Sequence, residues 1–595
     1  QYLHLKGRYA LAEEVATKAL NLRQQELGKQ HPATAASLNN VGVLHQDMGQ
    51  FSQSEIQLKQ AVAQHQTLFG EDSRPYALSL NNLGMLQYKL GQYEKARNNL
   101  SRCLEILEED LNEKGKSLTP FRVNLAQAHQ ELGEYEQAET IYSELLDMYE
   151  GLGKSSEAAG YVAVHAASLY LEKEEPQKAE EQLNRALNIY EKHFGKNSLA
   201  YARTLNHLSQ LHAHNGNWKR MKTAASKALN IRQKLLPETH PDLLESMEEA
   251  AVAHWKLGNG EKAAQFFRQL SQKRIDELEN VFPAMNEYEK GKYWAKVRPS
   301  LMVFYNFALG YQEEDPEFLT TAYTLHARTK GLLLSSAAKV KRQILNQGDQ
   351  ALKTQYLQWV DQKEQLALYY TYSEAQLSEE GVNLDSLESA AQASEKALAK
   401  ASSGFSKAYS LPQGNYREIT ATLEEGEAAI ELMRLQEFQG RWTGDVKYVA
   451  LIARKDEPYP EAVVLEKGMH LENKVSKFYR KAVTMQVEDR HSYPNFWQPI
   501  EQALESAKTL YLSIDGVYNQ LNINTFLRDD KQYVLDVFNV NYLTSTRQLL
   551  QKDSSRPSTK SALLLGFPDY GSGGKIAPLP GTAKEIQGIS EVLSQ

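Results

Sequence analysis

The thiol of Cys103 is the only cysteine side chain in the 595 residues. A nucleophilic thiolate needs a positive, partly exposed setting and a base within hydrogen-bond reach. Cys103 instead falls at a helix position that other segments of the chain fill with Ala19, Ala61 and Ala186. Because a free cysteine behaves as a small buried hydrophobe, we predict that Cys103 is structural.

Two further groups of residues suggest chemistry. His207, His212 and His214 form a histidine cluster, but no carboxylate follows at ligand spacing, so we predict no metal site and no cofactor. The glycine-rich segment 566–574 precedes Lys575 but lacks the Ser or Thr and the spacing of a phosphate-binding loop. The sequence contains neither a GxSxG elbow nor an HExxH pair.

Composition limits the class of protein. Hydrophobic residues make up 42% and charged residues 24%, which excludes wholesale disorder, and the length suggests about three or four domains. The 75 Asp and Glu outnumber the 67 Lys and Arg, and no basic run supplies a face for nucleic acid. No apolar run is long enough to span a membrane, and the single cysteine fits a reducing cytoplasm. Because the chain begins at Gln1 inside a helical pattern and stops at Gln595 inside another, we expect it to be cut at both ends.

A repeat organises the first half of the chain. A Gly, one residue and an aromatic recur mainly at intervals of 42 residues, with Glu174 in the glycine slot once and Gly258 closing the series. The glycine permits a tight turn between two antiparallel helices, and mostly small residues seven apart on the second helix let a neighbour approach closely. The pairs are Gly7/Tyr9, Gly49/Phe51, Gly91/Tyr93, Gly133/Tyr135 and Gly216/Trp218.

A second amphipathic helix precedes each turn, as in Leu38–Gly42, Leu80–Gly84 and Val123–Ala126. This pattern resembles the tetratricopeptide repeat, in the long form seen in kinesin light chains. The resemblance covers residues 1–272, in about seven repeats, and implies a right-handed superhelix with a concave groove.

In the family that this array resembles, an asparagine in the first helix of each repeat points into the groove and holds the backbone of a bound peptide. The corresponding residues here are Asn40, Asn82, Asn124, His165, His207 and Glu249. We predict a groove for a peptide or protein ligand, better supported in the first three repeats because they keep asparagine. The alternative is that these asparagines only satisfy hydrogen bonds between helices.

Residues 273–412 stay helical but lose the 42-residue register. Arg298–Tyr311 and Glu317–Leu334 are predicted to form one helix pair, and residues 352–372 and 384–409 two long helices. We interpret this stretch as a helical spacer and expect it to pass displacements of the array to the following domain. The alternative is that the spacer is only a rigid arm.

From 413 to 595 the pattern alternates between strands and helices, which predicts an α/β domain with a parallel or mixed sheet. Helices are expected at Leu471–Thr484, Phe496–Ser506 and Gly581–Leu593. The expected strands are Ala428–Met433, Tyr448–Ala453, Ala462–Leu465, Thr509–Ile514, Tyr533–Val537 and Ala562–Leu565.

Four motifs in this domain occur in a characteristic order. They are Leu510–Gly516, Tyr542–Thr546, Leu563–Tyr570 and Leu579–Glu585. Behind a tetratricopeptide array they resemble the CHAT domain, a caspase-related module. The predicted architecture is therefore an α-helical tetratricopeptide superhelix, a helical spacer and an α/β caspase-like (CHAT) domain that is incomplete at its carboxyl end.

The CHAT resemblance implies a cysteine endopeptidase whose catalytic His stands in a His-Gly turn and whose nucleophilic Cys ends a later strand. Both are expected beyond Gln595, so the chain as printed should be inactive. The leading hypothesis is a bacterial, cytoplasmic protease that senses a protein or peptide partner and cleaves a protein substrate in defence or cell death. The alternative is a non-catalytic adaptor with a pseudo-enzyme domain. We expect no membrane and no direct nucleic-acid binding.

Overall fold

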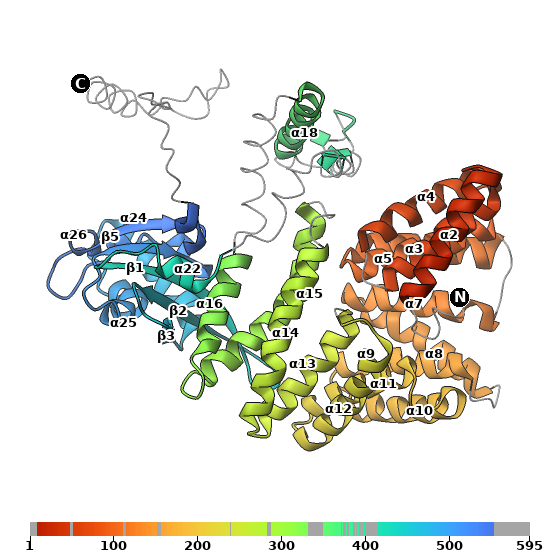
Figure 1. Ribbon diagram of the computed structural model, residues 1–595, viewed down its shortest axis with the longest axis horizontal. Helices are drawn as coiled ribbons and strands as arrows, with labels where there is room; N and C mark the ends of the chain where they lie inside the picture. Colours follow the sequence, from red (N-terminus) through yellow and green to blue (C-terminus); the bar gives the residue numbers. More distant parts are fainter. Residues whose placement is uncertain are drawn as a thin grey trace. The chain divides into compact units, whose positions relative to one another are not determined.

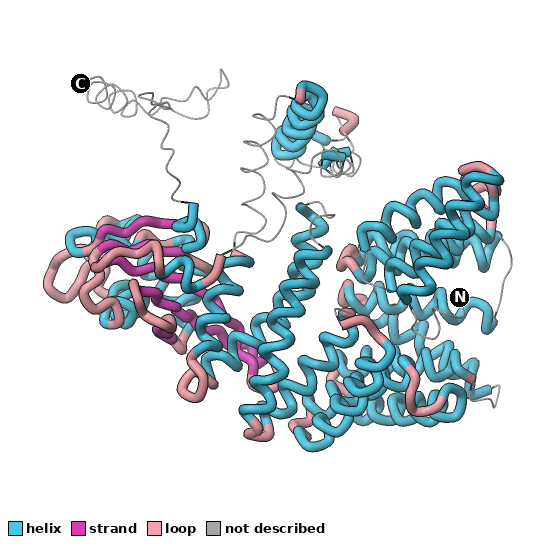
Figure 2. The backbone as a smooth tube through the Cα atoms, viewed as in Figure 1, coloured by secondary structure: helices cyan, strands magenta, loops and turns pink. Residues whose placement is uncertain are grey.

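The structure is a computed structural model of the chain (Figures 1 and 2). Gln1–Arg547 form one compact unit and Gln548–Gln595 a second. The strand predicted at 562–565, the helix predicted at 581–593 and most of the helix predicted at 384–409 lie outside the described residues. These are 9–47, 51–110, 115–151, 156–238, 240–281, 287–330, 349–369, scattered positions between 372 and 398, and 414–551.

The first half of the chain is an array of antiparallel helix pairs, as the repeat predicts. In each pair the second helix starts at or just after the aromatic or glycine of the turn. The helices are α2 (Tyr9–Leu27), α3 (Pro32–Asp47), α4 (Phe51–Phe69), α5 (Arg74–Lys89), α6 (Tyr93–Glu105), α7 (Thr119–Glu131), α8 (Tyr135–Gly151), α9 (Glu157–Glu172), α10 (Pro176–Phe194), α11 (Leu199–His214), α12 (Trp218–Leu235), α13 (Pro241–Lys256) and α14 (Gly260–Val281), with η1 (Ile106–Asp110) and η2 (Gly115–Leu118) between α6 and α7.

The turns of the array explain the repeated glycine. Gly91, Gly133 and Gly216 all have positive φ, between 68° and 77°, a conformation that glycine adopts without strain. Glu174 takes the same left-handed conformation, with φ of 59°, where the sequence substitutes the glycine. Small residues that follow, such as Ala96, are completely buried, so adjacent helices approach closely.

Helices far apart in sequence also meet within the first unit. The Nε2 atom of His240, at the start of α13, lies 2.7 Å from the carbonyl oxygen of Asp47 at the end of α3. Lys296 donates to the carbonyl oxygen of Lys89 at 3.2 Å. These contacts join residues that are 193 and 207 positions apart, so α13 and α15 both lie against the first helices of the array.

The middle region continues the helical packing. α15 (Glu287–Gly310) starts earlier than the predicted Arg298 and contains Pro299, and α16 (Glu317–Thr329) pairs with it. α18 (Gln350–Tyr369) matches the first predicted long helix. Among the described residues, no helix is long and apolar enough to cross a membrane.

A mixed five-stranded sheet follows, in the order β3-β2-β1-β4-β5. β1 is antiparallel to β2 and parallel to β4, which in turn is parallel to β5. Figure 2 shows these strands together, in magenta. The bounds are β1 (Glu427–Phe438), β2 (Trp442–Arg454), β3 (Glu461–Leu465), β4 (Thr509–Ser513) and β5 (Asn539–Leu543).

Short helices connect the strands. The strand predicted at Tyr533–Val537 is wrong: residues 534–537 form a helical turn, in which Asp536 accepts a hydrogen bond from the backbone N–H of Tyr533 at 2.8 Å. The elements are α22 (Tyr416–Thr420), α23 (Gly468–His470), η4 (Leu471–Val475), α24 (Ser476–Met485), η5 (Tyr493–Trp497), α25 (Gln498–Gln502), η6 (Gly516–Gln520), η7 (Ile523–Thr525), α26 (Val534–Val537) and η8 (Thr546–Gln551).

The alternation of β1 separates two faces of the sheet. Ile430 and Leu432 lie in the main core with Tyr479 of α24 and Trp497 of η5. Glu431, which points the other way, meets α16 on the opposite face. Both faces of β1 are therefore buried, and the helical region itself supplies the cover of one of them.

Candidate functional site

Two of the three predicted groove asparagines, Asn82 and Asn124, belong to a hydrogen-bonded ladder between helices. Asn82 donates to Asn39 at 3.1 Å, and Asn124 donates to Asn81 at 2.8 Å. Each bond joins the first helices of adjacent repeats. The inter-helix role that the sequence left open is thus present for Asn82 and Asn124, whereas the side chain of Asn40 is exposed.

The corresponding residues of the next three repeats differ. His165 packs edge-on against Tyr161, with ring centroids 4.5 Å apart. Nε2 of His165, Nδ1 of His207 and Oε2 of Glu249 are buried atoms without a hydrogen-bond partner among the described residues. Unpaired buried polar atoms are rare in native proteins, so these three positions stand out from the asparagines of the first repeats.

Burial also sets the charge of these groups. It lowers the pKa of His207 to about 4 and that of His165 well below its usual value, so both imidazoles are neutral at neutral pH. Burial and the nearby Glu245 raise the pKa of Glu249 to about 8. Arg203, on the same helix as His207, lowers the pKa of both histidines further through its positive charge.

Cys103, His212 and His214 do not belong to the row of repeated groove positions. Cys103 is completely buried in a hydrophobic cluster with Leu80 and Leu107. His212 is buried and His214 is exposed. In the described part of the chain, no three His, Cys, Asp or Glu side chains are grouped so that they could hold a metal ion.

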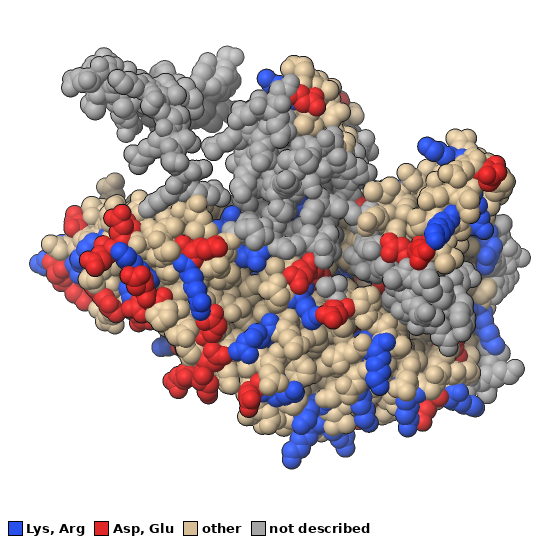
Figure 3. All heavy atoms as spheres, in the orientation of Figure 1, with Lys and Arg blue, Asp and Glu red and all other residues tan. Residues whose placement is uncertain are grey.

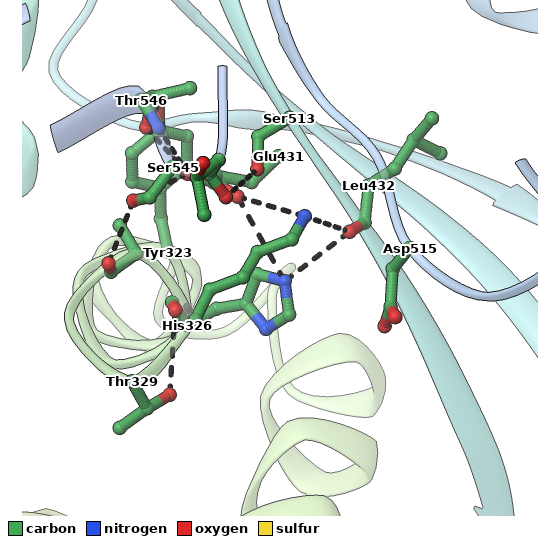
Figure 4. A network of polar contacts seen from close by, with 12 residues as sticks. Tyr323, His326, Thr329, Glu431, Leu432, Ser513, Asp515, Ser545 and Thr546 are labelled. Carbon is green, nitrogen blue, oxygen red and sulfur yellow. Dashed lines mark hydrogen bonds and ion pairs between the residues drawn. The ribbon is translucent and has the colours of Figure 1, made fainter. Parts of the chain in front are cut away.

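A buried polar network that the sequence did not predict surrounds Glu431 of β1 (Figure 4). Its Oε1 atom accepts hydrogen bonds from Thr546, through both N–H and hydroxyl, and from the hydroxyl of Ser545 at 3.2 Å. Its Oε2 atom lies 3.3 Å from Nζ of Lys330 and 3.9 Å from Nε2 of His326. The carboxylate thus joins the end of α16 to the segment that follows β5.

The charges in this network are balanced. Burial alone would raise the pKa of Glu431, but Lys330, His326 and the N–H of Thr546 outweigh it and hold the pKa below its usual value. Burial, assisted by Lys330, lowers the pKa of His326 to about 4. At neutral pH the network therefore contains one carboxylate, one ammonium group and a neutral imidazole.

The tip of the β1–β2 hairpin docks on the last helices of the array and on α15, which follows them. Asn306 of α15 donates to the carbonyl oxygen of Gln436 at 3.0 Å and accepts from the N–H of Phe438 at 3.2 Å. The ring of Phe438 stacks on Trp255 of α13, with centroids 6.4 Å apart. Between Phe438 and β2 lies Gly440, where a Cβ atom would stand 2.2 Å from the indole of Trp218. The hairpin therefore fits tightly against α12, α13 and α15.

Two family models match parts of the chain. A tetratricopeptide-repeat model matches residues 1–66, 45–109, 119–192 and 200–272, and a CHAT-domain model matches residues 492–595. The chain therefore contains tetratricopeptide repeats within residues 1–272 and a CHAT domain at residues 492–595. No curated protein matches it.

Solved structures resemble parts of this TPR–CHAT chain at low identity. BtubC (BKLC) from P. vanneervenii is 19% identical over 39% of this chain and 91% of its own, with a TM-score of 0.30. A putative kinesin light chain from Podosopora anserina is 18% identical over 41% of this chain and 97% of its own, with a TM-score of 0.22. A Rap protein complexed with Competence and Sporulation Factor is 14% identical over 53% and 96%, with a TM-score of 0.34.

The residues that match the CHAT-domain model contain only part of the five-stranded sheet. It includes β4 and β5 but starts after β1, β2 and β3. Because β1 is hydrogen-bonded to β4 over Glu427–Glu431, the earlier strands complete the sheet of the CHAT region. Thr546 and Ser545 of the Glu431 network lie within the matched residues, and Lys330 and His326 lie in the helical region before them.

Proposed function

We propose that this chain is the sensing and relay part of a TPR-regulated, caspase-like cysteine endopeptidase. The array binds a protein or peptide partner, and the CHAT domain, which we place at 413–595, cleaves a partner protein in bacterial defence or regulated cell death. The observation that supports the proposal is the docking of the β1–β2 hairpin on Trp218 and Trp255 of the array and on Asn306 of α15.

In this proposal, strand β1 passes a displacement of the array to the network around Glu431. A solenoid changes its curvature through small rotations that add up over its repeats, and α12, α13 and α15 hold the hairpin tip. From Phe438 at that tip to Glu431 in the network, β1 spans seven residues, about 23 Å of extended chain. A displacement of the array would thus reach Thr546 through α12, α13 and α15, without passing through residues 349–412 of the predicted spacer.

The ligand site of the array is proposed to run along the repeated position. The unpaired atoms of His165, His207 and Glu249 favour repeats four to six as the part that hydrogen-bonds an extended peptide. Asn40 and the ladder of Asn82 and Asn124 continue the same row toward the first repeats.

The chemistry itself needs residues that this sequence does not contain. Its one thiol, Cys103, is buried in the array, so a nucleophile of the CHAT domain would have to follow Gln595. The coding sequence beyond Gln595 provides the first test. A strand ending in His-Gly and a later strand ending in Cys would support the protease, and their absence would leave an adaptor that scaffolds its partners.

A pair of glycine substitutions tests the relay in the full-length protein. Gly440 and Gly444 both have positive φ, 88° and 86°, so alanine strains the backbone equally at either position. Only at Gly440 would the new Cβ also strike Trp218, because nothing lies within 4 Å at Gly444. We expect Gly440→Ala to abolish partner-triggered cleavage and Gly444→Ala to preserve most of it. Equal cleavage by the two variants would refute the relay through the hairpin.

A further inference from the structure

The outward face of α24 and of η4 before it carries a concentration of positive charge. Four cationic side chains point into solvent here and make no hydrogen bond or ion pair with any described residue: Lys474, Lys477, Arg480 and Lys481. Elsewhere over the sheet region, on the face drawn in Figure 3, acidic and basic side chains lie beside one another. The four unpaired cations are therefore a local departure from that pattern.

Apolar side chains are exposed among these cations. Phe478 is 43% exposed and Met485 65% exposed, and both line a groove of about 660 Å³ together with the cations. Of the large apolar side chains most exposed in the described part of the chain, five of eighteen fall between residues 469 and 487. Exposed apolar area of this density commonly marks an interaction site. We call Lys474, Lys477, Phe478, Arg480, Lys481 and Met485 the α24 surface.

The acidic groups nearest in sequence do not neutralise this surface. Glu472 is bound by Arg434, at 2.6 Å, and by the hydroxyl of Tyr448 at 2.8 Å. Glu488 pairs with Arg490 at 2.9 Å. Because these carboxylates are engaged elsewhere, the positive potential of the α24 surface remains available to a ligand.

We propose that the α24 surface docks an acidic segment of a partner protein, with an apolar side chain of that segment seated between Phe478 and Met485. Charge complementarity selects the acidic partner, and the concave apolar floor selects a segment that also carries a protruding apolar group. This docking surface goes beyond the proposed function, since it involves neither the array groove nor any catalytic residue.

Two other occupants fit less well. Residues 548–595 of the same chain contain five Lys or Arg and four Asp or Glu, so they offer no excess of negative charge. A lipid surface would require an amphipathic helix that can submerge its apolar face. The apolar face of this helix, with Val475 and Tyr479, is already packed in the core of the sheet.

Fluorescence anisotropy with the 595-residue protein tests the proposal. The probe is a fluorescein-labelled peptide of Glu-Glu-Leu repeats, and a second peptide replaces each Leu by Ser. The variants are Lys477→Glu with Lys481→Glu, and Phe478→Ala. The matched control is Lys227→Glu with Lys234→Glu, which reverses two exposed charges on α12.

Each exposed ion pair contributes a modest part of the binding free energy. Reversal of the two α24 charges should therefore weaken binding of the Leu-containing peptide about tenfold. Phe478→Ala should weaken the same peptide about threefold and leave the Ser peptide unchanged. The control pair should bind as the parent protein does. Equal losses in the control, or tighter binding of phosphatidylserine vesicles or a single-stranded oligonucleotide than of the peptide, would overturn the proposal. None of these measurements needs cleavage or an array ligand. Their outcome therefore does not depend on whether the proposed function is correct.

Discussion

Glu431 of β1 accepts two hydrogen bonds from Thr546, one from its backbone N–H and one from its hydroxyl, each at 2.7 Å. The two residues are 115 positions apart, and the same carboxylate also lies against Lys330 of the helical region. A single buried side chain thus holds together the helical region, the centre of the sheet and the segment that leads out of it.

Removing parts of this network should destabilise the sheet by graded amounts. Thr546→Val, which loses one donor, should lower the free energy of unfolding by about 1–2 kcal/mol. Glu431→Gln, which leaves the buried ammonium of Lys330 without its counter-charge, should cost about 3–5 kcal/mol. Urea unfolding measures both. Thr354→Val on the exposed face of α18 is the control, and a loss at Thr546 no larger than at Thr354 would contradict the network's role.

Acidification should weaken the same region in two stages. His326 has a folded pKa of about 4, below the unfolded value of 6.5, so the stability due to its neutral form is complete above 6.5 and is lost as pH falls toward 4. Glu431, whose pKa is also lowered, loses its contribution below about 4.5. Among the groups that face His326 are Lys330, Glu431 and Asp515. In His326→Gln, the loss of thermal stability between pH 6.5 and 4.5 should be smaller, and an unchanged profile would show that another group titrates.

Glu249 should have the opposite pH dependence. Its pKa rises to about 8 in the folded protein, so its contribution to stability falls as pH rises from 4.5 to 8. Glu249→Gln removes the need to ionise a buried carboxyl, and should raise the melting temperature at pH 9 more than at pH 4.5. The exposed Glu181→Gln is the control. Equal shifts at the two pH values would mean that Glu249 is ionised without penalty.

Cys103 should tolerate replacement. Its thiol is fully buried among apolar side chains, and the matching positions Ala61 and Ala186 are alanine. Cys103→Ala should cost about 1 kcal/mol of stability and leave any cleavage by the full-length protein intact. Cleavage lost at unchanged melting temperature would instead give the thiol a chemical role.

Variants of Asn40, Asn82 and Asn124 distinguish the role of this row in ligand binding from its role in stability. Changing Asn40, Asn82 and Asn124 together to Ala should weaken partner binding and also lower the melting temperature, because two of them belong to the ladder. Asn40→Ala alone should weaken binding and keep the melting temperature, since that side chain is exposed. An unchanged affinity in the triple variant, measured by calorimetry with an identified partner, would exclude this row from the groove.

Local patterns in the sequence predicted the array well. Each repeat is a local unit whose turn depends on a residue with positive φ. Gly91 and Gly133 therefore predict their helix pairs from the local sequence alone. Strands β1 to β4 were predicted, but β5 (Asn539–Leu543) was not. The strand expected just before it, at Tyr533–Val537, is an apolar run of strand-like composition that Asp536 caps into a helical turn.

The network and the docked hairpin could not be predicted in this way. Glu431 is one acidic residue in an apolar strand, and its partners Lys330 and Thr546 lie 101 and 115 residues away. Tertiary packing alone brings them together, and one sequence contains no local trace of it. The aromatics Phe438 and Trp442 around Gly440 were the single visible hint that the hairpin tip contacts another surface.

The docking of the hairpin also has a consequence for how the protein is made. An isolated two-stranded hairpin is marginally stable in water, and β4 is synthesised only after β1 and β2 have left the ribosome. The helices that hold the tip, from Trp218 to Asn306, emerge earlier still. Since amino-terminal segments fold first during synthesis, the completed array can serve as a template on which the hairpin settles, so that β1 is already in place when β4 arrives to pair with it.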